Sequence, residues 1–292
     1  MLSTPDDDIL ERFEEALNQR ALSASTLVNY LADLRAFYRW GQQTISDSFS
    51  FFTTSQEHIR LYRHHLSQTL NRAPSTTNRH LMSLRKFYAF ALDTDAVVAD
   101  PTIGVALVGM DNGQAISRPL SSKEISKLLE AAQNGTRAGL VKRDTAILQL
   151  LLHTGLRVGE LVDLQKDDLV FDNPGIHLQV CDPRDRSNIR DLPVSNEARK
   201  ALIDYLQMRP NTAATNCFFL NQEGRPISKR TVQRIINDCA KTAGLSGVSA
   251  QSIRRTYALQ LFSKTEDLTL VSKRLGHQNK TITEQYLSIH VQ

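Results

Sequence analysis

The stretch RDTAILQLLLHTGLRVGELVDL, residues 143–164, predicts two helices separated by an interruption at Thr154-Gly155. The interruption places Arg157 in the first turn of the second helix. Free backbone amides and the helix dipole favour an anion at that end of a helix. Two interpretations are open: Arg157 binds an anionic group together with these amides, or it is solvated or paired with an acid such as Glu160.

Two further motifs lie downstream and carry polar side chains on helical patterns. QSIRRTYALQLF, residues 251–262, places Arg254 and Arg255 on a helix. LGHQNKTITEQYL, residues 275–287, supplies His277 and, nine residues later, Tyr286. Taken singly, the arginines are typical of a surface, the histidine of a helix cap and the tyrosine of a half-buried core position.

The first hundred residues predict a set of amphipathic helices. Thr4-Pro5 followed by three aspartates is a strong helix start. A second helix runs through STLVNYLADLRAFYRWG, residues 25–41, and Gly41 is expected to end it. A third is expected near residues 56–70, and a fourth runs through STTNRHLMSLRKFYAFAL, residues 75–92. The second and fourth helices share a Leu-Arg-x-Phe-Tyr element.

Past residue 97 the pattern changes twice. Residues 98–119 lack periodicity and contain Pro and Gly, so an extended linker is expected there. A helix starts near Ser121 or Ser122 with Glu124 close behind, and short strands are expected in DDLVFDNPGIHLQV and NIRDLPVS. From residue 195 the chain is mostly helical, so the expected fold class is mainly α with one small β-sheet.

Composition excludes several classes of protein. The chain has 292 residues, 41% hydrophobic and 23% charged, which is typical of globular domains. It contains no apolar run long enough for a bilayer, and its acidic N-terminus does not resemble a signal peptide. Cys181, Cys217 and Cys239 lie far apart without metal-ligand spacing, so a reducing cytoplasm is the expected location.

The formal charge of +4 is unevenly distributed. Residues 1–116 hold 10 Lys and Arg against 13 Asp and Glu, whereas residues 117–292 hold 25 against 18. A basic C-terminal half is compatible with a polyanionic partner.

Taken together, the motifs have a characteristic order: Thr-Gly-Leu-Arg, an Arg-Arg-Thr helix 97 residues later, Leu-Gly-His, and a tyrosine nine residues beyond. This order resembles the tyrosine recombinase (phage integrase) family, and the layout is closest to Xer-like or transposon-encoded site-specific recombinases. The helices of residues 24–92 resemble the family's core-binding domain. The resemblance implies a helical, SAM-like core-binding domain over 1–100 that clamps DNA, a linker over 101–118 and a catalytic domain over 119–292.

The resemblance also implies roles for individual residues. Arg157 and Arg254 correspond to the two arginines that grip the DNA phosphate, and His277 corresponds to a third phosphate contact. Tyr286 corresponds to the nucleophile that forms a covalent 3′-phosphotyrosine, a reaction that uses no metal or nucleotide cofactor. The DNA-contacting candidates share a cationic or hydroxyl side chain; they are Ser75, Thr76, Arg79, Arg85, Lys86, Lys229, Arg230 and Arg255.

Double-stranded DNA with inverted-repeat core sites is the implied partner, and a homotetramer is the implied working unit, with accessory proteins as further candidates. Two other functions are compatible with the motifs: a DNA-binding protein of the same fold without strand cleavage, and a relaxing topoisomerase.

The first departure from the family pattern lies three residues before the second arginine. The family usually carries histidine there, whereas this chain has Gln251. Glutamine can hydrogen-bond to phosphate but cannot exchange a proton. Proton transfer is then expected to fall to His277 or to water.

The second departure concerns the family's general acid, a lysine on a β-hairpin. Alignment on the Arg-Asp-Leu-Pro segment puts Asn188 at that position, and no lysine lies between Lys166 and Lys200. Arg184 and Arg186 are the nearest cations, and arginine holds its proton too firmly to act as an acid. Arg186 is therefore a substitute in electrostatics only, and slow or accessory-dependent cleavage is expected.

Overall fold

The computed structural model describes residues 4–19, 22, 24–109, 118–134, 138–171, 175–182, 185–209, 215–277 and 280–287. Within these ranges the side chains of residues 24, 138, 171, 182, 185–188, 280–281 and 285–286 are outside the description. The chain divides into two units, Met1–Gln114 and Ala115–Gln292. The expected class, mainly α with a small sheet, is confirmed.

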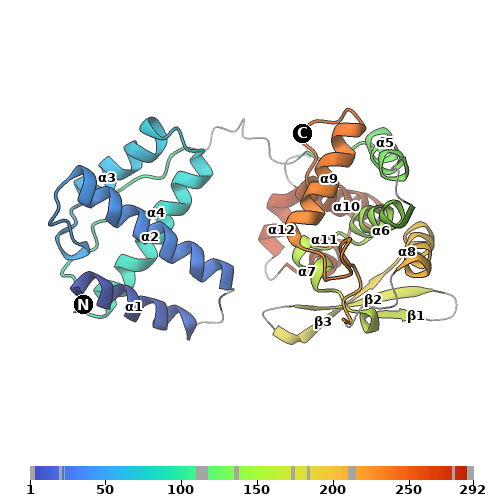
Figure 1. Ribbon diagram of the computed structural model, residues 1–292, viewed down its shortest axis with the longest axis horizontal. Helices are drawn as coiled ribbons and strands as arrows, with labels where there is room; N and C mark the ends of the chain where they lie inside the picture. Colours follow the sequence, from blue (N-terminus) through green and yellow to red (C-terminus); the bar gives the residue numbers. More distant parts are fainter. Residues whose placement is uncertain are drawn as a thin grey trace. The chain divides into compact units, whose positions relative to one another are not determined.

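The N-terminal unit is built from helices (Figure 1). They are α1 (Pro5–Asn18), α2 (Ala24–Thr44), α3 (Gln56–His64) and α4 (Pro74–Asp93), with two short helical turns, η1 (Phe51–Thr53) and η2 (His65–Thr69). Thr4 caps α1 as expected, because its side chain accepts a hydrogen bond from the backbone N–H of Asp7.

The repeated Leu-Arg-x-Phe-Tyr elements supply the centre of this unit. Leu34 and Phe37 on α2 and Leu84 and Phe87 on α4 are all fully buried. The same spacing therefore turns the same side chains inward on both helices, as periodicity predicts.

One helix end was predicted wrongly. Gly41 does not end α2, which continues to Thr44. A Cβ at Gly41 would lie 2.2 Å from Cδ1 of Phe49, so the glycine allows the aromatic ring to pack against the helix backbone.

Part of the segment expected as linker packs against α4. Asn78 binds the backbone of Val108 through both ends of its amide, at 2.9 and 2.8 Å. Arg85 donates to the carbonyl of Val105 at 2.6 Å, and the Val105 side chain is buried. Residues 101–109 thus belong with the N-terminal unit, whereas residues 110–117 lie outside the described residues.

The C-terminal unit combines helices with one antiparallel sheet of order β1–β2–β3. Its strands are β1 (Leu169–Phe171), β2 (Ile176–Asp182) and β3 (Asp185–Pro193). Its helices are α5 (Ser122–Gln133), α6 (Ala138–Thr154), α7 (Val158–Asp163), α8 (Asn196–Met208), α9 (Lys229–Thr242), α10 (Ala250–Thr265), α11 (Leu268–Leu275) and α12 (Lys280–Leu287), with the short turn η3 (Lys166–Asp168) before the sheet.

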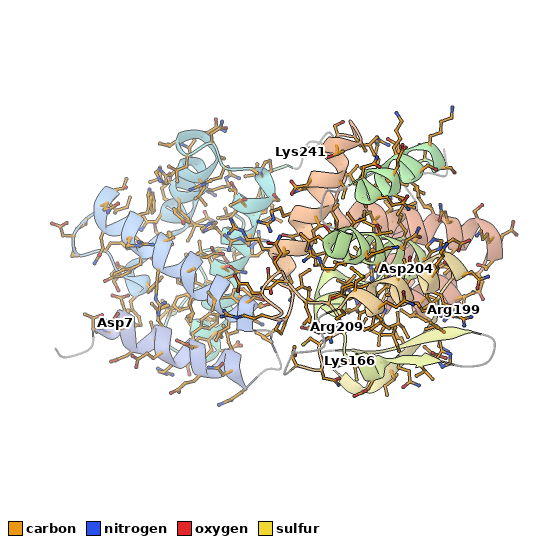
Figure 2. The ribbon with its side chains drawn as sticks, turned by 45° about the vertical axis from the view of Figure 1, so that its right-hand side comes forward. Asp7, Lys166, Arg199, Asp204, Arg209 and Lys241 are labelled. Atoms are coloured by element: carbon orange, nitrogen blue, oxygen red, sulfur yellow. The ribbon has the colours of Figure 1, made fainter. Side chains whose placement is uncertain are left out.

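The sheet lies along one edge of this unit, and the helices pack together on one face of the sheet (Figure 1). Leu178 on β2 pairs with Leu169 on one side and Leu192 on the other, and all three are buried. On α6 and α8, Lys142 and Asp204 form an ion pair at 2.8 Å; Asp204 is marked in Figure 2. Within the described part of the chain, no helix is long and apolar enough to cross a membrane.

Candidate active site

Arg157 stands where the sequence places it, between α6 and α7. Gly155 ends α6 in the left-handed region, and Arg157 precedes the first residue of α7. Its backbone N–H donates to Oε2 of Glu160 at 2.8 Å, and its Nη1 donates to Oε1 of the same carboxylate at 2.8 Å. The side chain remains 43% exposed, so the guanidinium keeps a face toward solvent.

Arg254 reaches the same region from α10 but is buried. Nη1 donates to the carbonyl of Gly155 at 2.6 Å, and Nη2 donates to that of Leu275 at 2.5 Å. The Arg254 side chain therefore ties the α6–α7 turn to the end of α11, two segments that are far apart in the sequence.

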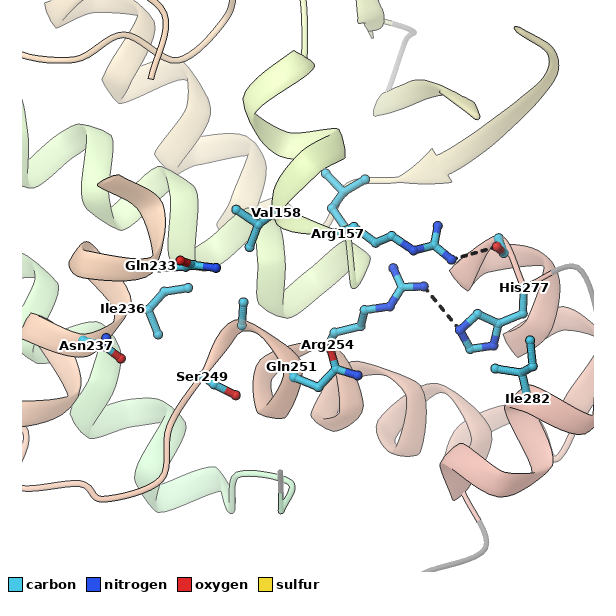
Figure 3. A pocket seen from close by; sticks show the side chains of 13 residues that line it. Arg157, Val158, Gln233, Ile236, Asn237, Ser249, Gln251, Arg254, His277 and Ile282 are labelled. Carbon is cyan, nitrogen blue, oxygen red and sulfur yellow. Dashed lines mark hydrogen bonds between the residues drawn. The ribbon is translucent and has the colours of Figure 1, made fainter. Parts of the chain in front are cut away.

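His277 follows the end of α11, which Gly276 closes in the left-handed region with φ of 62°. A Cβ at Gly276 would also lie 2.6 Å from Nη1 of Arg190, so no other residue fits without displacing that guanidinium. Nε2 of His277 lies 3.4 Å from Nη2 of Arg254 (Figure 3). Burial, followed by the charges of Arg254, Arg157 and Arg190, lowers the pKa of His277 to about 4.

Glu160 is the centre of the cationic cluster. Its side chain is 2% exposed and hydrogen-bonds to Arg157 and Arg190, and its Oε2 lies 4.0 Å from Nη1 of Arg254. Three guanidinium groups thus share one carboxylate. The excess positive charge favours an anion beside them.

Arg190 joins the sheet to this cluster and is buried on β3. It hydrogen-bonds to Glu160 and donates through Nη1 to the carbonyl of Arg274 at 3.0 Å. Arg274 in turn donates to the carbonyl of Asp191. We call this reciprocal pair of contacts between β3 and α11 the arginine clasp.

A cavity of about 790 Å³ opens beside the cluster. Arg157, Arg254 and His277 point into one region of it, and Gln251 lies beside Arg254 on α10 (Figure 3). Gln233 and other residues of α9 line the opposite wall. Two arginines, a histidine and an amide therefore converge on one space with room for an anionic group.

The expected nucleophile lies on α12. The backbone of Tyr286 belongs to this helix, but its side chain is outside the described residues. Two neighbours place the helix at the site: Thr283 contacts His277, and Ile282 lines the cavity. Leu287 anchors the end of α12 in a small core against α10 and α11.

The candidates for the missing hairpin lysine are Asn188, Arg186 and Arg184. Asn188 and Arg186 belong to β3, with side chains outside the described residues, and Arg184 lies outside them altogether. Lys166, the last lysine before this segment, is on η3 and is marked in Figure 2. The role of Arg186 as a substitute in electrostatics only therefore stays a prediction.

The DNA-contacting candidates fall into three groups. Ser75 and Thr76 lie in the first turn of α4, and Lys229 and Arg230 are exposed at the start of α9. Lys86 is half-buried on α4.

Three arginine candidates are held by contacts within the protein. Arg79 forms an ion pair with the buried Asp33, yet its side chain is 45% exposed. Arg85 donates to the backbone of residue 105. Arg255 is only 2% exposed, which contradicts the expected contact with DNA.

Glu160 and Arg190 are the site residues whose roles the sequence did not reveal. Glu160 appeared only as a local partner of Arg157, and its position three residues later is the spacing of a helix cap. Arg190 carried no local signal, because its contact with Glu160 depends on how the sheet packs. Among the described residues, no three His, Cys, Asp or Glu side chains gather to hold a metal ion.

Family comparisons agree with this geometry. Residues 118–292 match the model of the phage integrase family, and residues 9–96 match its N-terminal SAM-like domain. The chain therefore belongs to the phage integrase family, whose members are tyrosine recombinases.

Individual relatives share most of their length with this chain. It is 31% identical over 274 residues to the tyrosine recombinase XerC of Staphylococcus haemolyticus, covering 93% of this chain and 88% of the relative. It is 30% identical over 282 residues to XerC of Lactobacillus delbrueckii subsp. bulgaricus, covering 94% and 92%.

Solved structures share the fold at lower identity. The Tn1549 transposon integrase in complex with circular intermediate DNA has a TM-score of 0.75 at 18% identity, covering 95% of this chain and 94% of that one. The XerH recombinase bound to a palindromic difH substrate has a TM-score of 0.73 at 16% identity, covering 95% and 80%.

Proposed function

We propose that this protein is a site-specific DNA recombinase that cuts and rejoins strands through a covalent 3′-phosphotyrosine, in the integration, excision or resolution of a mobile element or replicon. The observation that carries the proposal is the convergence of Arg157, Arg254 and His277 on one cavity. The three groups come from segments separated by 120 residues, and they leave net positive charge at a single point. That arrangement fits one DNA phosphate.

The chemistry follows from the charges. In-line attack by the phenolic oxygen of Tyr286 forms a Tyr–phosphorus bond and breaks the bond from phosphorus to the 5′ oxygen. Arg157 and Arg254 stabilise the negative charge that grows on the two non-bridging oxygens. The phenol loses its proton to His277 or water, and the departing 5′ oxygen gains one. Attack by a 5′-hydroxyl of another strand reverses these steps and rejoins the DNA.

The proposed partner is duplex DNA bearing inverted core sites. Support comes from similar structures: a lambda integrase dimer bound to a COC′ core site and XerH bound to difH. Assembly on DNA, with a tetramer as the working unit and accessory proteins as regulators, belongs to the same proposal. So do a cytoplasmic location and a DNA clamp made by the N-terminal unit.

Phosphate contacts are proposed at Ser75, Thr76, Arg79, Lys229 and Arg230. The pairing of Arg79 with Asp33 supports its role, because a guanidinium held in place loses less entropy on meeting a phosphate. In Arg85 the same role competes with its hydrogen bond to the carbonyl of Val105, and Lys86 is half-buried on α4.

A DNA-binding protein without cleavage is the second candidate, and the absence of lysine between residues 166 and 200 favours it. Asn188 and Arg186 supply no proton at neutral pH. On the recombinase proposal, the 5′ oxygen then takes its proton from water, which makes cleavage slow.

A nicked suicide substrate separates the two candidates. Footprinting on DNA that flanks the gene first identifies the half-sites, and a duplex nicked beside the cleavage point then traps the covalent complex. We expect an adduct on a denaturing gel that is absent with Tyr286→Phe and retained with Tyr30→Phe. Specific binding without any adduct would identify a non-cleaving DNA-binding protein.

A further inference from the structure

His277 is held by a backbone hydrogen bond and by contacts of both ring nitrogens. Its backbone N–H donates to the carbonyl of Ser272 at 3.1 Å, which fixes the residue behind the cap of α11. Nδ1 lies 2.8 Å from the hydroxyl oxygen of Thr283, a fully buried residue on α12. Nε2 faces Arg254 across the cavity (Figure 3).

Without DNA, these partners select one form of the ring. A guanidinium only donates hydrogen bonds, so Nε2 facing Arg254 carries a lone pair. The single proton of the neutral imidazole is then on Nδ1, and it is donated to the Thr283 hydroxyl. In this form Nε2 can accept a proton.

Phosphate binding requires the opposite form. Phosphate oxygens only accept, so a hydrogen bond from His277 to phosphate needs the proton on Nε2. Nδ1 then carries the lone pair, and its partner must donate. A hydroxyl satisfies both forms because it can donate or accept by rotating its proton.

We propose that Thr283 is a positioning residue that supports both neutral tautomers of His277. Nε2 can then face the reacting phosphate as a donor in one state and act as a proton acceptor in another. The inference deepens the proposed function and rests on it for its catalytic consequence.

The surroundings of His277 give a function to the two neutral tautomers. Among the described residues that line the cavity, only His277 has a side chain that exchanges protons readily, since Gln251 replaces the usual histidine. The charged groups facing it are Arg254 on α10, Arg157 beside α7 and Arg190 on β3, with Glu160 behind them. They disfavour the doubly protonated ring in the free protein, so the resting imidazole is neutral and is present as one of its two tautomers.

Removal of the hydroxyl tests the proposal. Thr283→Val keeps the shape and removes the hydrogen bond, whereas Thr283→Ser keeps the hydroxyl. With the suicide substrate, we expect adduct formation by Thr283→Val to slow by about tenfold or more, the equivalent of one lost hydrogen bond. Thr283→Ser should stay within about threefold of the parent, and DNA affinity and thermal unfolding should be similar for both variants. Equal rates for Thr283→Val and the parent, or equal losses in both variants, would overturn it.

A second measurement does not depend on strand cleavage. Nitrogen NMR distinguishes protonated from unprotonated ring nitrogens, and a His277→Gln spectrum assigns the signals of His277. We expect the Nδ1–H form in the free protein and the Nε2–H form when Tyr286→Phe protein binds its duplex. The same tautomer in both states would refute the inference. If the parent protein formed no adduct, the proposed function would fail, while this measurement, repeated on Thr283→Val, would still decide the role of Thr283.

Discussion

Replacement of Glu160 by glutamine is the sharpest test of the cationic cluster. Glutamine keeps the size of the side chain but removes the one negative charge between Arg157, Arg190 and Arg254. Its amide NH₂ group would also face guanidinium donors, so at least one hydrogen bond becomes a clash of donors. We therefore expect Glu160→Gln to lower the free energy of unfolding of the C-terminal unit.

The size of the loss follows from burial. Glu160 and Arg190 have side chains only 2% and 5% exposed, and breaking a pair of this kind costs about 3–5 kcal/mol because a buried charge is left alone. The Arg157 pair is 43% exposed on the arginine side and adds about 0.5 kcal/mol at most. The contact with Arg254 at 4.0 Å is too long to be a strong ion pair. A loss of about 3–5 kcal/mol would lower Tm by roughly 6–20 °C in a unit of this size.

Urea unfolding at neutral pH measures the loss, with Glu223→Gln as the matched control. Glu223 pairs with Arg225 in an ion pair whose side chains are both well exposed, so its replacement should cost less than about 0.5 kcal/mol. The double variant Glu160→Gln with Arg190→Met should recover part of the loss, because it removes both buried charges. A loss below about 1 kcal/mol for Glu160→Gln would refute the assignment of Glu160 as the centre of the cluster.

Three further predictions follow from named contacts. The pKa of His277 is lowered to about 4 from an ordinary 6.5, so the unfolded chain takes up a proton at a higher pH than the folded protein does, and the free energy of unfolding falls as pH drops from about 6.5 to about 4. Between pH 7 and pH 4, the free energy of unfolding of His277→Gln should therefore fall by about 1–2 kcal/mol less than that of the parent. Lys229→Ala should reduce the salt slope of DNA binding by about 0.9, whereas Lys241→Ala, at the other end of α9 (Figure 2), should leave it unchanged in a fluorescence titration over salt. Gly41→Ala should lower the free energy of unfolding by about 1–3 kcal/mol in urea, because the new methyl group meets the Phe49 ring, and an unchanged value would contradict that packing.

Local patterns predicted the helices of the N-terminal unit well. The apolar spacing identified α2 and α4, and Leu34 and Leu84 are buried as that spacing requires. The error at Gly41 has a physical origin: glycine weakens a helix but also allows close packing, and only the position of Phe49 decides between these effects.

The candidate site was predicted in part. The motif order pointed to Arg157, Arg254 and His277, and the structure brings these three together. Arg255 was misassigned because α10 is buried on several sides, so its periodicity does not tell which of its two buried arginines lines the cavity.

The contacts that hold the site together were harder to predict. Arg190 meets Glu160 across 30 residues, through the packing of β3 against α7 and α11. Pairings of this kind depend on tertiary structure, and no local spacing signals them. The repeated polar helix starts similarly gave no indication that Asp33 is buried beneath Arg79.

The arginine clasp has a consequence for how a movement of the β2–β3 hairpin affects the catalytic residues. Arg190 and Arg274 each grip the main chain of the other's segment, and Gly276 lies against the Arg190 guanidinium. A rigid-body shift of β3 would therefore move the C-terminal end of α11 together with the imidazole of His277, which follows it. Because of this linkage, movement of the hairpin and assembly of the reactive groups would be a single concerted event rather than two independent ones.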